Sequence, residues 1–338
     1  MAIKIGLIGA ALGHPKTFTA ALRAGAMADV VGLWTDGGAE DAESARATQF
    51  CSELNLRRFA DRDELLRHCD AVIITTQTCR HAAFAVETLA SGKPTFVDKP
   101  IATTLDDAAA IVRAARDAGV PMMSCSMRRY TPAFRTIADA CRNGDIGLPI
   151  SVSRFEPHGV APGDWQDRVA TSGGLIFNFG IHCVDSLQAA LGRATRVFAV
   201  GKKLVHQNVD SHDAATITIE FASGAVGFAE VIGAMTPGPL MATAPCMRAF
   251  ATENSLEARL VEHQTMQYSG GRYGVHPCYR AMGGADDMMA AFVAMAETGE
   301  PAIAYDDMLE VAMILEAART SAQTHATVEL ANLRTRIN

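Results

Sequence analysis

Residues 92–100 read Gly-Lys-Pro-Thr-Phe-Val-Asp-Lys-Pro, a short apolar run that ends in an acid, a lysine and a proline. The apolar run is typical of a buried strand. Pro100 favours an extended backbone at Lys99, which holds the lysine at the strand's carboxyl end. Ligands of open α/β sheets bind at these ends. The stretch therefore predicts a functional lysine in an α/β fold, with a plain Lys-Pro surface turn as the alternative.

The composition indicates a soluble globular protein with two domains. The chain has 338 residues, more than the roughly 250–300 at which single cores usually stop growing. Hydrophobic residues make up 49% of it, charged residues 20%, and the formal net charge is -7. Without a basic block to neutralise phosphates, nucleic acid is not an expected partner. No apolar run approaches the ~20 residues of a membrane helix, so no membrane association is expected.

The eight cysteines are scattered through apolar segments without a Cys-x-x-Cys pair. They fit small buried hydrophobic residues better than a zinc site or a disulfide framework. The sequence therefore predicts no metal site and a cytoplasmic location.

Predicted strands and helices alternate in residues 1–126. Six strands with helices between them predict a Rossmann domain with a doubly wound parallel sheet. The expected strands are residues 3–8, 30–34, 59, 71–74, 95–97 and 121–125, and the expected helices are residues 15–24, 40–54, 61–68, 80–91 and 105–118.

Strand candidates with little helix between them dominate residues 127–338. This part predicts an α/β domain for substrate binding and oligomerisation, with a large, mostly antiparallel open sheet. The expected strands are residues 150–155, 196–200, 215–221, 225–232 and 247–251, and the expected helices are residues 132–142, 175–191, 285–298 and 306–324.

The turn after the first strand predicts a phosphate-binding loop made of Gly9, Ala10, Ala11, Leu12 and Gly13. Dinucleotide-binding folds place Gly-x-Gly-x-x-Gly here, so that the backbone can approach the pyrophosphate. Gly9 matches the first position, whereas Ala11 stands at the second and Gly13 falls one residue before the third. The place of this turn in the first βα unit favours cofactor binding over a plain glycine-rich turn.

Asp36 ends the second predicted strand, about 20 residues beyond the loop, where an acid holds the adenosine ribose hydroxyls. The alternative is a turn aspartate before two glycines. No arginine stands beside Asp36 in the sequence to receive a 2′-phosphate. The expected cofactor is therefore NAD, with NADP not excluded.

Residues 172–185 read Ser-Gly-Gly-Leu-Ile-Phe-Asn-Phe-Gly-Ile-His-Cys-Val-Asp. On one continuous helix, Asn178, His182 and Asp185 would form a polar stripe. A lone histidine on such a helix is more often structural. The amide one turn earlier and the two glycines at the helix entry favour a functional histidine.

These segments resemble those of the Gfo/Idh/MocA (glucose-fructose oxidoreductase, inositol dehydrogenase, rhizopine catabolism) family. Residues 92–100 match Gly-Lys-x-Val-x-x-Glu-Lys-Pro, residues 173–185 match Gly-Gly-x-x-x-Asp-x-Gly-x-His-x-x-Asp, and residues 128–132 read Arg-Arg-Tyr-Thr-Pro. The resemblance covers nearly the whole chain. It implies a nicotinamide cofactor on the N-terminal domain and a small-molecule substrate against the C-terminal sheet. The implied reaction is hydride transfer to or from a sugar, a polyol or a related compound.

The resemblance also assigns site residues, with Lys99 and His182 as the acid-base and substrate-positioning pair. The expected catalytic residues are Lys99, His182 and Asn178. The expected cofactor-binding residues are Gly9, Ala10, Ala11, Leu12, Gly13, Asp36, Thr75, Thr76, His81, Asp98 and Lys99. The expected substrate-binding residues are Arg128, His158, Trp165, Arg168, Asn178 and His182.

Three departures from the family pattern concern the altered glycine loop, Asp98 in place of glutamate, and Asn178 in place of aspartate. Free histidine has a pKa of about 6.5, whereas a lysine base would need its pKa lowered by roughly 3 units. We therefore expect His182 to be the base and Lys99 to stabilise the developing alkoxide. Asn178 cannot lend negative charge to an imidazolium, which weakens the dehydrogenase interpretation.

Two other functions stay open. The protein could be a redox-neutral, NAD-assisted glycosidase or lyase, as some members of the family are. It could also be a cofactor-binding sensor without turnover, which Asn178 favours and the pair of Lys99 and His182 opposes. In each case a homodimer or homotetramer through the C-terminal sheet is expected.

Overall fold

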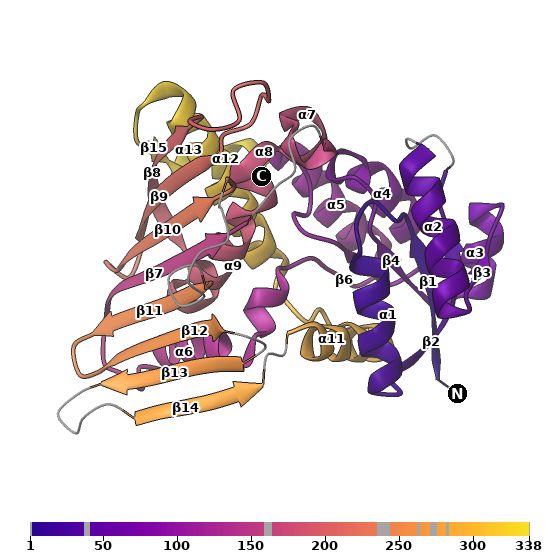
Figure 1. The fold of residues 1–338 in the computed structure, drawn as a ribbon, viewed down its shortest axis with the longest axis horizontal. Coiled ribbons are helices and arrows are strands. Elements are labelled where there is room, and N and C mark those ends of the chain that lie inside the picture. Colours follow the sequence, from indigo (N-terminus) through magenta and orange to yellow (C-terminus); the bar gives the residue numbers. More distant parts are fainter. Residues whose placement is uncertain are drawn as a thin grey trace. The chain divides into compact units, whose positions relative to one another are not determined.

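The computed structural model describes residues 2–36, 41–158, 164–234, 244–261, 264–270, 276–281 and 284–337. They form two compact units, the first of Met1–Cys125 and Ala285–Met308, the second of Ser126–Gly284 and Leu309–Asn338 (Figure 1). The sequence predicts a single division of the chain after residue 126. In the structure, residues 285–308 also belong to the first unit. None of the helices in the described ranges is long and apolar enough to cross a membrane.

The first unit is built on a six-stranded parallel sheet with the order β3-β2-β1-β4-β5-β6. The chain starts in the middle of this sheet and reaches both edges, so the predicted doubly wound Rossmann fold is confirmed. Its strands are β1 (Ile3–Ile8), β2 (Ala28–Trp34), β3 (Arg57–Arg58), β4 (Ala71–Ile74), β5 (Thr95–Val97) and β6 (Met122–Met123). Its helices are α1 (His14–Ala24), α2 (Asp41–Leu54), α3 (Arg62–His68), η1 (Thr78–Arg80), α4 (His81–Ala90), α5 (Leu105–Ala118) and α11 (Ala285–Thr298).

Local side-chain chemistry sets the ends of these helices. The Asp61 side chain accepts a hydrogen bond from the backbone N–H of Glu64 at 2.7 Å, which caps α3. Thr104 caps α5 in the same way through the N–H of Asp107, at 3.1 Å. The helix then ends at Gly119, whose φ of 62° is left-handed.

The second unit is built on a nine-stranded sheet with the order β14-β13-β12-β11-β7-β10-β9-β8-β15. Its strands pair antiparallel except for β7 and β10, which are parallel, so the predicted mostly antiparallel sheet is confirmed. Its strands are β7 (Pro149–Pro157), β8 (Ala194–Lys202), β9 (Ala214–Phe221), β10 (Val226–Ile232), β11 (Cys246–Ala251), β12 (Ser255–Val261), β13 (Gln264–Gly270), β14 (His276–Ala281) and β15 (Val328–Glu329). Its helices are η2 (Met127–Tyr130), α6 (Pro132–Asn143), η3 (Trp165–Asp167), α7 (Val169–Ser172), α8 (Gly174–Asn178), α9 (Gly180–Leu191), α13 (Leu330–Ile337) and most of α12 (Tyr305–Thr324).

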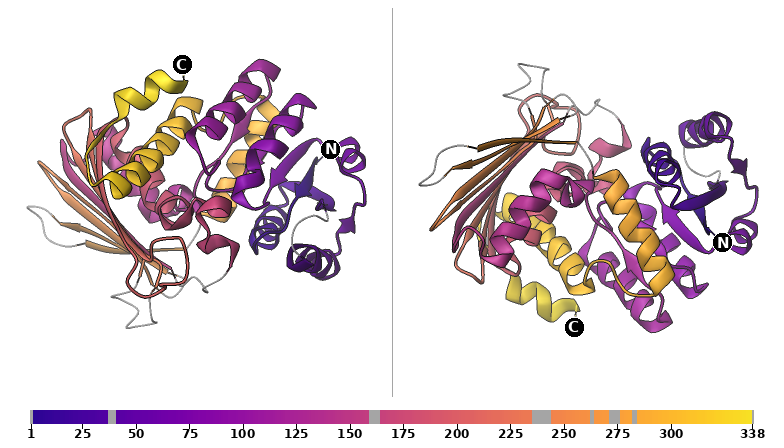
Figure 2. Two further views of the ribbon diagram at one scale, coloured as in Figure 1. Left: turned by 90° about the horizontal axis from the view of Figure 1, so that it is seen from above. Right: turned by 90° about the horizontal axis from the view of Figure 1, so that it is seen from below.

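Helices cover one face of this sheet, and the opposite face carries none of the described helices (Figure 2). Helix α9 packs on β7 and β10, and α6 packs on β11 and β12. In β7 the buried side chains are those of Val152, Arg154 and Glu156, at alternating positions. Because alternate residues of a strand share a face, two charged side chains of β7 lie under the helices.

Candidate active site

The turn after β1 forms the first part of the site. Gly9 has a φ of 91°, and a Cβ added to it would lie 2.6 Å from the nitrogen of Thr76, so only glycine fits. The N–H of Thr75 donates to the carbonyl oxygen of Ile8 at 2.8 Å, and its hydroxyl donates to that of Gly9 at 2.7 Å. These contacts join the carboxyl ends of β1 and β4, where doubly wound sheets bind ligands.

Two side chains of α2, which are not part of the predicted glycine motif, form hydrogen bonds to this loop. The Glu43 carboxylate accepts the N–H of Ala10 at 2.9 Å. Arg46 donates to the carbonyl oxygens of Ala10 and Ala11 at 2.8 and 2.6 Å. Glu43 is buried, and burial raises the pKa of its carboxyl group against the opposing effects of the Ala10 hydrogen bond, Arg46 and Arg58. Neither residue is predictable from the sequence, because a contact between a helix and a distant loop has no local pattern.

An ion pair ties the loop to the lysine segment. His14 begins α1, and its Nδ1 contacts Oδ2 of Asp98, directly after β5. The other carboxylate oxygen of Asp98 accepts the N–H of Lys99 at 2.8 Å. Burial opposes the charge on Asp98, but His14, Lys99 and His81 together hold the pKa of its carboxyl group below the usual value. Asp98 is therefore a carboxylate at neutral pH.

Lys99 lies at the carboxyl end of β5, as the sequence predicts, and is 8% exposed. His81, at the start of α4, links this segment to the turn after β4. Its Nδ1 lies 2.9 Å from the carbonyl oxygen of Pro100, and its Nε2 lies 3.1 Å from that of Thr76. Burial lowers the pKa of His81 although Asp98 acts in the opposite direction. A neutral His81 can donate to only one of the two carbonyl groups at a time.

Asp36, directly after β2, has an arginine partner that the sequence analysis did not find. Arg80 Nη1 donates to Asp36 Oδ1 at 2.9 Å, and its guanidinium lies over the ring of Phe84 at 4.9 Å. The expectation that no arginine stands beside Asp36 is therefore wrong. The partner comes from 44 residues further along the chain, through the η1 turn after β4.

In the second unit, the expected single helix over residues 175–191 is two helices, α8 and α9, separated at Phe179. Asn178 is the last residue of α8, while His182 and Asp185 lie in α9. The prediction of one continuous helical stripe is wrong, in agreement with the low helix propensity of the Gly180 that follows the break. All three polar residues are nevertheless buried.

The His182 ring is held by a residue that precedes η2. Ser126 Oγ lies 2.6 Å from His182 Nδ1. The backbone N–H of Ser126 donates to Asp185 Oδ2 at 2.9 Å, and Arg129 donates to Asp185 Oδ1 at 2.7 Å. The aspartate thus fixes the serine, and the serine contacts the imidazole.

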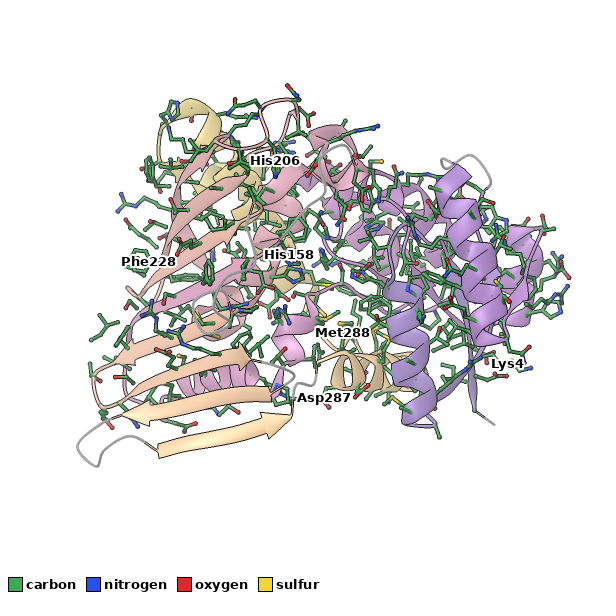
Figure 3. All side chains as sticks on the ribbon, viewed as in Figure 1. Lys4, His158, His206, Phe228, Asp287 and Met288 are labelled. Atoms are coloured by element: carbon green, nitrogen blue, oxygen red, sulfur yellow. The ribbon has the colours of Figure 1, made fainter. Side chains whose placement is uncertain are left out.

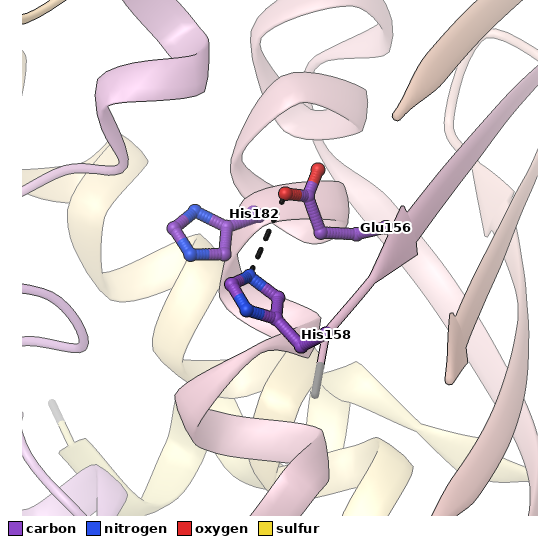
Figure 4. A group of neighbouring side chains, drawn as sticks. All are labelled: Glu156, His158 and His182. Atoms are coloured by element: carbon purple, nitrogen blue, oxygen red, sulfur yellow. Dashed lines mark ion pairs between the residues drawn. The ribbon is translucent and has the colours of Figure 1, made fainter. Parts of the chain in front are cut away.

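A second histidine lies against the first. The His158 and His182 rings are stacked, with centroids 5.6 Å apart, and His158 Nε2 is 3.7 Å from Glu156 Oε1 (Figure 4). Glu156 is fully buried and binds two arginines, Arg128 through Oε1 at 2.8 Å and Arg154 through Oε2 at 2.9 Å. Although burial favours the protonated acid, these two cations hold the pKa of Glu156 below the usual value.

Glu156, His158 and His182 offer three potential metal ligand atoms within 4.8 Å of one another. Both carboxylate oxygens of Glu156, however, already bind guanidinium groups. Two arginines around one glutamate leave an excess positive charge beside the histidines, which opposes the entry of a divalent cation. The electrostatics therefore favour a polar or anionic organic ligand at this cluster.

The remaining predicted substrate residues precede the two glycines of the second motif. Trp165 is buried in η3, whereas the Arg168 side chain is exposed. The carbonyl oxygen of Arg168 accepts the Ser172 hydroxyl at 3.0 Å, which ties this segment to the turn at Gly173. That glycine has a φ of 80° and, with Gly174, sets the entry into α8.

Two matches to known sequence families together cover most of the chain. Residues 3–125 match the Gfo/Idh/MocA family described as "Oxidoreductase family, NAD-binding Rossmann fold", and residues 134–257 match the Gfo/Idh/MocA C-terminal domain. The chain belongs to the Gfo/Idh/MocA family. This confirms the predicted family and the NAD-binding Rossmann domain.

Individual Gfo/Idh/MocA relatives match parts of the chain. The scyllo-inositol 2-dehydrogenase (NAD(+)) of Bacillus subtilis (strain 168) is 33% identical over 201 residues, 56% of this chain and 57% of that relative. The D-apiose dehydrogenase of Paraburkholderia graminis is 32% identical over 203 residues, 56% of this chain and 53% of that relative. The chain spans about half the length of the curated relatives it matches.

Solved Gfo/Idh/MocA structures share the fold over nearly the whole chain. Levoglucosan dehydrogenase, in complex with NADH and levoglucosan, has a TM-score of 0.85 and 20% sequence identity. The alignment covers 97% of this chain and 99% of that chain.

The first unit fits the dinucleotide of the Gfo/Idh/MocA family. Gly9 permits close approach at the switch point, and a Cβ at Gly13 would meet nothing within 4 Å. Helix α1 begins directly after this open position; Pro15 has no N–H, and the N–H groups of Lys16 and Thr17 donate to the carbonyl oxygen of Gly13 at 3.1 and 3.2 Å. Of the predicted site residues, those for the cofactor lie in this unit together with Lys99. Asn178, His182, Arg128, His158, Trp165 and Arg168 lie in the second unit.

Proposed function

We propose that the protein is an NAD-dependent oxidoreductase that transfers a hydride between nicotinamide and a hydroxyl or carbonyl group of a sugar, a polyol or a related small molecule. The observation that carries this proposal is the presence of both Lys99, at the carboxyl end of β5, and a buried His182 held in position by Ser126. A module that only binds a cofactor has no evident need for this pair. The dehydrogenase names of the curated relatives support the same reaction class.

Each group of residues has a distinct task in this proposal. The backbone of the loop around Gly9 binds the pyrophosphate, and Asp36 accepts hydrogen bonds from the ribose. Bound NAD supplies the hydride acceptor. Lys99 stabilises negative charge on the substrate oxygen, as an ammonium group does for an alkoxide.

The second unit supplies the substrate contacts. His182 contacts the reacting oxygen, and Arg128 and His158, both next to Glu156, orient the rest of the substrate. The excess positive charge of this cluster favours substrates with several oxygen acceptors, such as polyols and sugar acids.

The open face of the nine-stranded sheet is the proposed oligomerisation surface. Phe198 and Phe228 both pair with Thr218, so they lie in one row across β8, β9 and β10. Phe250 is exposed on β11, which β7 separates from β10. Their exposed fractions are 41%, 45% and 48% (Phe228 is labelled in Figure 3). Exposed aromatic rows of this kind mark protein interfaces. We expect Phe228→Asp to convert the homodimer or homotetramer into a monomer in sedimentation experiments, whereas an unchanged mass would exclude this surface.

A cytoplasmic location belongs to the same proposal. The cysteines whose side chains the structure describes are all free thiols, and six of the seven are buried. Free thiols are typical of a reducing compartment.

A titration with NADH and NADPH, followed by fluorescence, tests cofactor binding. Turnover is then measured with NAD and a panel of inositols, sugars and sugar acids, as growth of the reduced-nicotinamide absorbance. We expect binding of NADH, oxidation of at least one panel member, and loss of turnover in Lys99→Ala and His182→Ala. The exposed Lys4→Ala and His68→Ala are matched controls that keep it. Cofactor binding without net NADH formation would support the redox-neutral or sensor functions instead.

A further inference from the structure

We propose that Ser126 is a positioning residue that keeps the proton of neutral His182 on Nε2, so that this histidine meets the substrate oxygen as a hydrogen-bond donor. The identity of that oxygen rests on the proposed function. The placement of the proton rests only on contacts within the second unit.

The hydrogen bonds of Ser126 are completely defined among the described residues. Its Oγ lies 2.6 Å from His182 Nδ1 and accepts the N–H of Arg128 at 3.0 Å. Its N–H donates to Asp185 at 2.9 Å, and its carbonyl oxygen accepts the N–H of Arg129 at 3.0 Å. The residue has 0% exposure, so neither solvent nor a backbone shift offers the hydroxyl another partner.

Two neutral tautomers of His182 can be compared at this contact. A serine hydroxyl has one proton to donate and two lone pairs to accept. If Nδ1 carried the proton, Oγ would accept from both His182 and Arg128. The hydroxyl proton would then have no acceptor among the described residues.

If Nδ1 is unprotonated, every group at this contact is satisfied. The Ser126 hydroxyl donates to Nδ1, its oxygen accepts from Arg128, and the imidazole proton lies on Nε2. Leaving a buried donor without an acceptor shifts such an equilibrium on the order of tenfold or more. The geometry thus selects the Nε2–H tautomer.

Two further groups contact His182. Arg154 donates to the His182 carbonyl oxygen at 3.4 Å, and the His158 ring is stacked on it. Asn178, one turn earlier in the chain, is an amide and carries no negative charge. The charged or titratable side chains that make contacts in this part of the second unit include Arg128, Arg129, Arg154, Glu156, His158 and Asp185.

This tautomer gives His182 a different task from the base role expected from the sequence. A base at Nε2 must be unprotonated before the reaction, whereas an N–H at Nε2 donates to a carbonyl or alkoxide oxygen and stabilises its charge. The proton of the hydroxyl group then passes to Lys99, which accepts it as the neutral amine in oxidation and returns it as the ammonium in reduction. In other histidine sites the partner of the imidazole is a carboxylate, which can only accept a hydrogen bond. Here the partner is a serine hydroxyl, which can also donate one. A partner that donates a hydrogen bond to Nδ1 places the ring proton on Nε2, whereas a partner that accepts from Nδ1 keeps the proton on Nδ1.

The tautomer can be measured on the whole protein without substrate, labelled with 15N-histidine. Two-bond and three-bond 1H–15N correlation spectra at neutral pH distinguish protonated from unprotonated ring nitrogens, and the spectrum of His182→Gln assigns the signals. We expect an unprotonated Nδ1 and a protonated Nε2. A protonated Nδ1, whether in the other tautomer or in an imidazolium, would overturn the proposal. Because substrate is absent, this result is independent of the proposed function.

Variants of Ser126 then test whether the serine is responsible. Ser126→Ala should move the Nδ1 resonance and lower kcat/KM for the panel substrate by roughly 10- to 100-fold, and Ser126→Thr should restore the resonance. The matched control is Ser186→Ala, which removes a buried hydroxyl from the same histidine's carbonyl oxygen, 2.9 Å away. It should leave the ring signals in place. An unchanged Nδ1 resonance in folded Ser126→Ala would refute the role of the serine. If this variant does not fold, the spectrum of the wild-type protein still decides which tautomer His182 adopts.

Discussion

His14 and Asp98 form an ion pair across 84 residues of sequence, between the glycine loop and the end of β5. Both positions depart from the family pattern. His14 stands where Gly-x-Gly-x-x-Gly has its third glycine, and Asp98 stands where the Lys-Pro motif has glutamate. In this chain the two departures are in direct contact with each other.

A double-mutant cycle with His14→Ala and Asp98→Asn tests this coupling. Because the Asp98 carboxylate is buried, we expect the free energies of unfolding to be non-additive by about 1–3 kcal/mol. Urea unfolding of the wild type, both single variants and the double variant provides the four values. Additive effects within about 0.5 kcal/mol would show that the two residues are independent.

The pair of Asp36 and Arg80 predicts the response of cofactor preference to mutation. The carboxylate repels a 2′-phosphate, while the guanidinium that neutralises it could bind one. Asp36→Ser should therefore free Arg80 and improve the affinity for NADPH relative to NADH by roughly tenfold or more. Arg80→Ala should shift the ratio of the two dissociation constants towards NADH. Fluorescence titrations measure both, and an unchanged ratio in Asp36→Ser would contradict the assignment of this carboxylate to the ribose.

The fold was largely predictable because its strands and helices have local patterns. A buried apolar run such as residues 71–74 predicts a strand, and a glycine such as Gly119 predicts the end of a helix. The strands β13 and β14 were missed because their sequences, such as Gln-Thr-Met-Gln-Tyr-Ser-Gly in β13, lack a clear apolar pattern. The strand β12 did carry a signal, since its buried Leu256, Ala258 and Leu260 alternate with polar residues. The strands β13 and β14 are defined by pairing with neighbouring strands rather than by propensity. The strand expected at Phe59 is β3, at the two preceding arginines.

The candidate site was predictable only where a motif spans adjacent residues. Lys99 and His182 belong to such motifs. Ser126, Glu43 and Arg80 reach the site through tertiary contacts with no sequence periodicity. Arg154 and Glu156 did leave a signal, since two opposite charges at alternate positions of a strand share a face and can be buried as a pair.

We expect replacement of the buried Glu43 by glutamine to stabilise the protein in a pH-dependent way. Burial raises the pKa of its carboxyl group above the ordinary value of 4.5. The native state therefore holds this proton more tightly than the unfolded state, and the stabilisation disappears as the pH rises through the raised pKa. Glu43→Gln keeps an oxygen for the Ala10 N–H and removes the titration.

The free energy of unfolding of Glu43→Gln should exceed that of the wild type at pH 8, and the difference should shrink towards pH 4. Chemical denaturation at several pH values between these limits provides the comparison. Glu53→Gln, on the same helix but at its surface, is the control and should show no comparable pH-dependent gain in stability. A constant difference across the range would show that Glu43 is not the titrating group.

Glu156 predicts the largest loss of stability. It is the counter-ion of the fully buried Arg154 and of Arg128. Glu156→Gln leaves both guanidinium groups without a carboxylate, so we expect unfolding to become easier by about 3–5 kcal/mol at pH 7. Glu220→Gln removes the partner of Arg196 from an exposed pair and should cost at most about 1 kcal/mol.

The pH dependence of the Glu156 effect has the opposite sign to that of Glu43. Burial opposes ionisation, but Arg128 and Arg154 hold the pKa of Glu156 below its ordinary value of 4.5. Its contribution to stability is thus complete above that value and is lost as the pH falls through the lowered pKa. The difference between wild type and Glu156→Gln should be constant from pH 8 to pH 5 and narrow in more acidic solution. If the difference narrowed already between pH 7 and pH 5, the carboxylate would titrate too high for a group held by two buried cations.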